Sequence, residues 1–199
     1  MRPFFLIQLV LFLFIGLKGK TQDLQIDPNY EGPYSFDGDK IKKQIEFNLL
    51  PNKNYVFNLN HKFRLKLHGI AASLKLDLDG DSKIYFDNVA TDNILITSIN
   101  GGSRIEDIPG SYPKDTIYLA RALHVEHFNG GSVISIKHLS FEYASLDDIN
   151  GQGFLDLIVR KKLDGRLNSD ECHVYLLNGC SPNVDSFYIQ IASQLVHRK

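Results

Sequence analysis

Residues 54–86, which read NYVFNLNHKFRLKLHGIAASLKLDLDGDSKIYF, indicate the fold class most plainly. Apolar and polar residues alternate with a period of two through three successive segments of this stretch. The apolar sets are Tyr55, Phe57 and Leu59, then Phe63, Leu65 and Leu67, then Leu74, Leu76 and Leu78. Because such alternation places one side of a strand in a core and the other in water, it predicts half-buried antiparallel strands.

The rest of the chain continues in the same way, without an apolar stripe at helical spacing over ten or more residues. Further strand segments are predicted at residues 43–49, 84–86, 94–99, 116–124, 132–143, 154–159, 173–177 and 185–192. About ten short strands separated by turn formers predict an all-β domain, namely an antiparallel β-sandwich of jelly-roll type. Within residues 132–143 the apolar parity switches at Lys137-His138, which predicts a β-bulge.

Four turn sequences resemble one another: NGGS at Asn100, NGGS at Asn129, NGQG at Asn150 and NGCS at Asn178. Their spacings of 29, 21 and 28 residues are unequal, and their flanking sequences differ. Asn-Gly is also the favoured dipeptide of tight turns in general. We therefore interpret the four as independent turns and not as internal repeats.

The first residues, MRPFFLIQLVLFLFIGLKG, combine a basic start, an apolar run from Phe4 to Leu17 and a small residue at Gly19. This pattern predicts a signal peptide at residues 1–19, followed by an N-terminal arm at 20–40 and one β-sandwich domain at 41–199. The expected location is secreted, with no membrane span after cleavage. The remaining 20 basic and 23 acidic residues give no electrostatic footprint for nucleic acid.

The two cysteines, Cys172 and Cys180, both fall in the part expected to be secreted. An even number of cysteines in an oxidising compartment predicts one disulfide between them. The loop that this bond would close is short, so its expected contribution is local, about 2–3 kcal/mol.

The densest cluster of acids is Asp77, Asp79 and Asp81, around Gly80. Carboxylates are hard oxygen ligands, so the cluster is a candidate calcium site, although its spacing does not match an EF-hand. Alternatively, Asp77 and Asp79 project from one side of a strand and are candidate carboxylates of a glycoside hydrolase. The plainest interpretation is the polar side of a strand that ends in an Asp79-Gly80 hairpin turn.

The longest segment without periodicity is Asn100–Lys114, NGGSRIEDIPGSYPK, which predicts an exposed loop. Loops of this length often carry function. Tyr112 is its candidate exposed aromatic residue, and charged neighbours could bind a polar ligand. The candidate ligand-binding residues are Arg104, Glu106, Asp107, Tyr112 and Lys114.

No nucleophile motif or phosphate-binding glycine loop is present in the sequence. The favoured hypothesis is therefore a secreted, non-enzymatic recognition domain that binds an extracellular protein or a carbohydrate through loops, without a cofactor other than possible Ca²⁺. Two alternatives stay open: a polysaccharide-acting hydrolase that uses strand carboxylates, and a structural component of an extracellular matrix.

Overall fold

The computed structural model describes residues 27–41, 44–113, 116–151, 153–168, 172–176 and 181–186, and their side chains as far as Gly165. The predicted signal peptide, Lys114 and Cys180 lie outside the described residues. The expected disulfide lies there too, because the structure describes only the backbone of Cys172; the described part of the chain contains no disulfide. Within the same residues there is no helix with the length and apolarity needed to cross a membrane.

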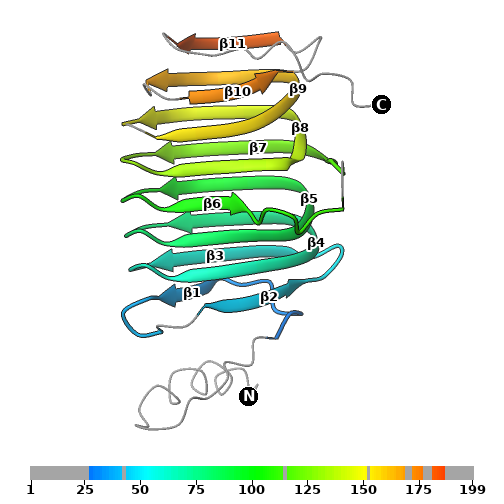
Figure 1. Ribbon diagram of the computed structural model, residues 1–199, viewed down its shortest axis with the longest axis vertical. Coiled ribbons are helices and arrows are strands. Elements are labelled where there is room, and N and C mark those ends of the chain that lie inside the picture. Colours follow the sequence, from blue (N-terminus) through cyan, green and yellow to red (C-terminus); the bar gives the residue numbers. More distant parts are fainter. Residues whose placement is uncertain are drawn as a thin grey trace, which may run out of the picture.

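The described chain forms a single β-solenoid in which successive coils stack along one axis (Figure 1). The strands are β1 (Tyr34–Asp37), β2 (Ile45–Leu49), β3 (Asn54–Asn60), β4 (Arg64–Leu78), β5 (Lys83–Ile99), β6 (Arg104–Asp107), β7 (Tyr118–Phe128), β8 (Val133–Asn150), β9 (Phe154–Asn168), β10 (Cys172–Leu176) and β11 (Ser181–Ser186). All their pairings are parallel. The predicted antiparallel sandwich or jelly roll is therefore wrong, whereas the all-β class is right.

The local sequence pattern is the same in the predicted fold and the observed one. A solenoid strand has one side in the interior of its own coil and the other in water, so it alternates like a half-buried antiparallel strand. The direction of pairing depends on the path that the chain takes after each turn. After Gly80 and Asp81, which have φ values of 62° and 63°, β5 does not fold back on β4 as a hairpin. It starts the next coil and pairs with β4 in parallel from Arg64–Lys83 onward.

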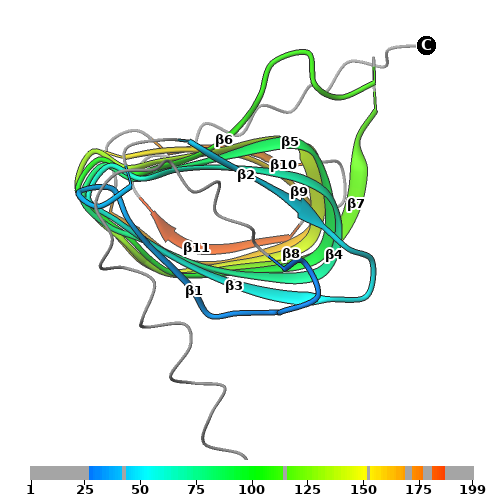
Figure 2. The same ribbon diagram turned by 90° about the horizontal axis from the view of Figure 1, so that it is seen from below.

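The coil is flattened, so the long strands bend and contribute to two faces (Figure 2). Face A consists of β2, β6, β10 and the first parts of β4, β5, β8 and β9. Face B consists of β1, β3, β11, most of β7 and the later parts of the same four long strands. The interior between the faces is apolar.

Apolar side chains in register stack through this interior. On face A one column contains Leu65, Ile84, Ile105, Ile134 and Leu155, all 0% exposed. A column on face B contains Phe57, Leu76, Ile96, Val125 and Leu146, also 0% exposed. Each coil therefore buries its apolar side chains against those of its neighbours, which is how a solenoid acquires a core that no single coil could form.

The Asn-Gly turns are the shared corner of successive coils, so the interpretation as independent turns is wrong. The backbone nitrogen of Asn100 donates to Leu78 of the previous coil, and that of Asn129 donates to Ile99. The Asn129 side-chain amide donates to Asn100 Oδ1 at 2.9 Å. The unequal spacing hides the repeat, because the coil from Asn100 to Asn129 contains the β6–β7 connection and is longer than the 21-residue coils beside it. Asn178 lies outside the described residues.

The predicted bulge at Lys137-His138 is confirmed. The register between β8 and β9 shifts here, because Ile136 and Ser140, four residues apart on β8, pair with the consecutive residues Leu157 and Ile158 on β9. The extra residues place His138 against the connection after β6, where it contributes to the candidate site.

Candidate functional site

A hollow of about 420 Å³ lies on the outer side of face A. It is lined by Gln44, Tyr85, Glu106, Asp107, Ile108, Pro109 and Ser135. Tyr85, Glu106 and Ser135 occupy equivalent outward positions in three neighbouring strands, because Tyr85 pairs with Glu106 and Glu106 pairs with Ser135. Because these three strands are stacked about 4.8 Å apart along the solenoid axis, the hollow that crosses them extends along that axis. We call it the face A groove.

One wall of the face A groove is the connection after β6, which begins at Ile108 and Pro109. In Figure 2 this connection projects away from the coil beyond the edge of face A. Its backbone is still tied to the sheet, since Ile108 N donates to Phe86 O at 2.9 Å. The predicted loop Asn100–Lys114 thus contains a strand, β6, and its irregular part starts only at Ile108.

Asp107 holds this connection in place. Its Oδ1 accepts the hydroxyl of Tyr112 at 3.0 Å. Its Oδ2 accepts the backbone nitrogens of Lys137 at 2.6 Å and His138 at 3.0 Å, and lies 2.9 Å from His138 Nδ1. The carboxylate is 8% exposed. Buried charges need several good hydrogen bonds to be tolerated, and Asp107 has them from two separate segments of the chain.

Tyr112 is buried, at 6% exposure, and not the exposed aromatic residue that was expected. Its ring stacks on the His138 imidazole with centroids 3.7 Å apart and planes 3° from parallel. Its hydroxyl also accepts a hydrogen bond from Val89 N at 3.3 Å. Burial, followed by the negative charge of Asp107, raises the pKa of Tyr112 well above its usual value. The phenol is therefore neutral, and it acts as an anchor for the connection and not as a ligand-binding surface.

The other predicted ligand-binding residues are close to the groove where the structure describes them. Arg104 and Glu106 both lie on β6, on the outer side of face A, and their side chains form an ion pair at 3.2 Å. Glu106 lines the face A groove, and Arg104 lies two residues before it on the same side of the strand. Lys114 lies outside the described residues.

Sequence reasoning missed Gln44, Tyr85 and Ser135 as lining residues. Tyr85 carried a usable signal, because it stands between the buried residues Ile84 and Phe86 and therefore has to face outward. What the sequence lacked was the pairing register that brings Tyr85 beside Glu106 and Ser135.

A cluster of charges borders the face A groove on β4 and β5. Asp87 Oδ2 lies 2.8 Å from Lys66 Nζ and 2.9 Å from His68 Nδ1, and Glu46 lies 3.6 Å from each of these two side chains. Burial by itself would raise the pKa of Asp87, but the hydrogen bond from Lys66 and the charge of His68 hold that pKa below its usual value. Asp87 is thus ionised at neutral pH, and Lys66 is engaged within the protein.

The three acids of the predicted calcium site do not converge. Asp77 lies on β4, where its carboxylate accepts a hydrogen bond from Thr97 at 3.4 Å. Asp79 binds the backbone nitrogen of Gly80 at 2.8 Å, and Asp81 has the left-handed φ of the corner turn. They are not among the described groups whose ligand atoms lie within 4.8 Å of one another. None of the three lines the face A groove either.

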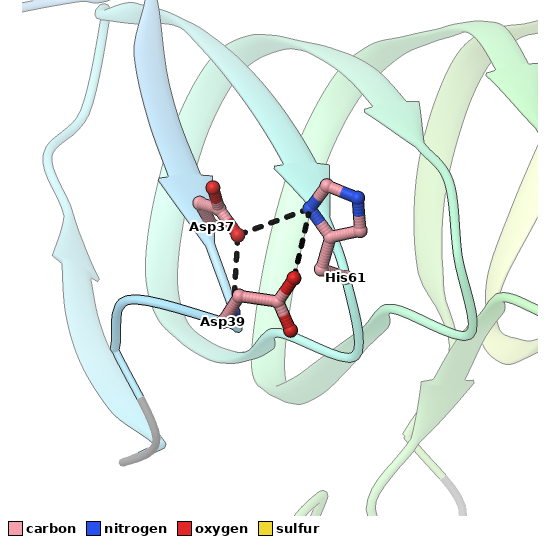
Figure 3. Close-up of side chains that lie close together, drawn as sticks. All are labelled: Asp37, Asp39 and His61. Carbon is pink, nitrogen blue, oxygen red and sulfur yellow. Dashed lines mark hydrogen bonds and ion pairs between the residues drawn. The ribbon is translucent and has the colours of Figure 1, made fainter.

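A different group could hold a metal ion: Asp37, Asp39 and His61, each with one ligand atom within 4.8 Å of the others (Figure 3). His61 Nδ1 lies 3.0 Å from Asp37 Oδ1 and 3.9 Å from Asp39 Oδ2. The group lies at the corner where the coil of β1 meets that of β3, with Asp39 and His61 exposed and Asp37 half-buried. The hydrogen bond from the Asp39 backbone lowers the pKa of Asp37 most, with smaller contributions from His61 and Lys40.

Comparison of the chain with protein-family models, with curated proteins and with solved structures finds no match. Any function of this chain therefore has to be inferred from the geometry of its own sites.

Proposed function

We propose that this protein is a secreted, non-enzymatic binding protein that holds a carbohydrate chain along the face A groove. The observation that carries the proposal is the alignment of Tyr85, Glu106 and Ser135 in register across three strands, beside a wall anchored by Asp107. An aromatic ring with polar groups around it suits a sugar, which presents both apolar C–H surfaces and hydroxyl groups. Because the groove follows the axis, the ligand it suits is extended.

Binding without catalysis is favoured by the state of the groove carboxylates. Hydrolysis by two carboxyl groups requires a pair about 5–9.5 Å apart, both free to act on the same bond. Of the two acids that line the groove, Asp107 is occupied by four donors and 8% exposed. Asp77 and Asp79, the acids of the hydrolase hypothesis, are not lining residues. Glu106 therefore lacks a free partner among the lining residues.

The test is a glycan array on the secreted protein, followed by calorimetric titration of the best ligand into wild type and two variants. Tyr85→Ala is expected to weaken binding about 10-fold, which is about 1.4 kcal/mol. Tyr143→Ala is the matched control, because Tyr143 is 45% exposed but lies on face B. Equal losses in the two variants would contradict the proposal. New reducing ends in the incubated glycan would replace it with the hydrolase alternative.

The metal hypothesis has its own test at Asp37, Asp39 and His61. One nitrogen and two carboxylates suit Zn²⁺, whereas Ca²⁺ requires six to eight oxygens. We expect zinc to raise the melting temperature more than calcium does, because binding to the folded state alone contributes about 2.7 kcal/mol at 100 times the dissociation constant. His61→Asn should remove the rise, since asparagine tolerates the φ of 54° at this position. A rise that persists in this variant would locate the ion elsewhere.

A further inference from the structure

A column of cations runs beside the face A groove. Arg64 of β4 pairs in register with Lys83 of β5, and Lys83 pairs with Arg104 of β6. All three side chains are on the outer side of face A, because their neighbours Leu65, Ile84 and Ile105 are buried. With about 4.8 Å between neighbouring strands, three positive charges follow one another along the solenoid axis.

Two of these cations have no counter-charge in the described part of the protein. Arg104 forms its ion pair with Glu106 at 3.2 Å. Among the ion pairs and hydrogen bonds of the described residues, none involves the side chain of Arg64 or Lys83. Like charges opposite each other on neighbouring strands destabilise a sheet. An anion that bridges neighbouring positions would relieve this repulsion.

The column and the groove are parallel and adjacent. Lys83 and Arg104 precede Tyr85 and Glu106 by two residues, so that each cation projects from the same side of its strand as the groove residue. Two residues along a parallel strand span about 6.6 Å, which long lysine and arginine side chains can reach across. A chain lying in the groove would therefore meet Lys83 beside Tyr85 and Arg104 beside Glu106, with Arg64 one strand further along on β4.

A further cation, Lys66 of β4, pairs in register with Tyr85 and is already engaged within the protein. Lys66 lies 2.8 Å from Asp87 and 3.6 Å from Glu46, so it adds little free positive charge. The net charge of the whole protein is −1, so this column is a local cluster of positive charge and not part of a generally basic surface. Because the column lies on one side of the face A groove, it favours a ligand whose acid groups are directed to that side.

We propose that the glycan held in the face A groove is an acidic polysaccharide, with its carboxylate or sulfate groups bound by Arg64, Lys83 and Arg104. The proposal rests on the proposed glycan-binding function. Arg104 and Glu106 act as one unit, in which arginine contacts the acid group and glutamate accepts from a sugar hydroxyl. Arg64 and Lys83 supply the charge that distinguishes an acidic chain from a neutral one.

The experiment compares four probes on the mature protein: a polyuronate, heparin, a neutral β-glucan and single-stranded DNA of similar length. We expect the polyuronate or heparin to bind at least 10-fold tighter than the β-glucan and the DNA, and the two acidic glycans distinguish carboxylate from sulfate. Raising the salt concentration from about 50 to 300 mM should weaken the binding, because exposed charges are screened.

Variants locate the binding. Arg64→Gln and Lys83→Gln are each expected to weaken acidic-glycan binding about 5-fold, and the double variant about 20-fold. Lys75→Gln is the matched control, since Lys75 is an exposed lysine of the same strand β4 on face B, and it should change the affinity less than 2-fold. Circular dichroism and melting temperature verify that all variants fold.

The outcomes separate this inference from the proposed function. If a neutral glycan binds with dependence on Tyr85 while Arg64→Gln and Lys83→Gln have no effect, the acidic specificity is wrong and glycan binding stands. If DNA binds as tightly as the acidic glycans, the column is a non-specific cation exchanger and the inference is overturned. If none of the glycans binds, both proposals fail.

Discussion

Asp107→Ala is expected to destabilise the protein by about 3–5 kcal/mol, the range for removing one partner of a buried charged contact. The substitution leaves the Tyr112 hydroxyl, the backbone nitrogens of Lys137 and His138, and His138 Nδ1 without their acceptor. The connection after β6 loses its anchor as a result. We therefore expect glycan binding to be lost together with stability.

Urea unfolding gives the change in stability, and limited proteolysis between Ile108 and Pro113 reports release of the connection. Asp107→Asn is the graded control, because asparagine keeps an oxygen acceptor but has no charge. It should reduce the free energy of unfolding by about half as much as Asp107→Ala does. A loss of less than about 1 kcal/mol in Asp107→Ala, within the range of ordinary surface substitutions, would contradict the anchoring role.

Phe86→Ala should cost about 3–5 kcal/mol, as expected for removal of a large aromatic side chain from a packed core. Phe86 is 0% exposed and pairs in register with Leu67 in the coil before it. Its backbone carbonyl also accepts from Ile108, so a cavity here weakens the support of the groove wall. The neighbour on the opposite side of the strand, Tyr85, provides the comparison.

The two adjacent substitutions separate folding from binding. Tyr85→Ala should reduce stability by less than about 1 kcal/mol, because the ring is on the outer side of the strand. The same substitution should weaken binding of the proposed glycan ligand. Phe86→Ala should lower the urea midpoint strongly and leave the m-value unchanged if unfolding stays cooperative. Equal destabilisation by both variants would mean that the assignment of inward and outward sides on β5 is wrong.

The sequence indicated most of the strand segments, although not β6, and it indicated which side of the central strands is buried. The predicted inward residues Phe57, Leu65 and Leu76 are all 0% exposed. The bulge at Lys137-His138 was also visible, as a switch in the parity of apolar residues. These features are local, because burial of alternate residues depends only on the pleat of the strand.

The candidate site could be predicted from the sequence only in part. Glu106 and Asp107 were identified from their place in an aperiodic segment, and both line the face A groove. The role of Asp107 as an anchor depends on His138, thirty-one residues later in the chain. Tyr112 was expected at the surface because it lies in the aperiodic segment Asn100–Lys114, and its stacking on His138 accounts for its burial.

By itself, the sequence determined an all-β chain with alternating strands and Asn-Gly turns. Whether those strands pair as hairpins or as stacked coils was decided by the tertiary structure, since both arrangements bury the same alternate residues and place glycine at the same turns. The repeat was hidden because the long coil between Asn100 and Asn129 breaks its period. A solenoid requires only that the turns and apolar columns lie over one another, and an extra connection outside the core leaves that stacking intact.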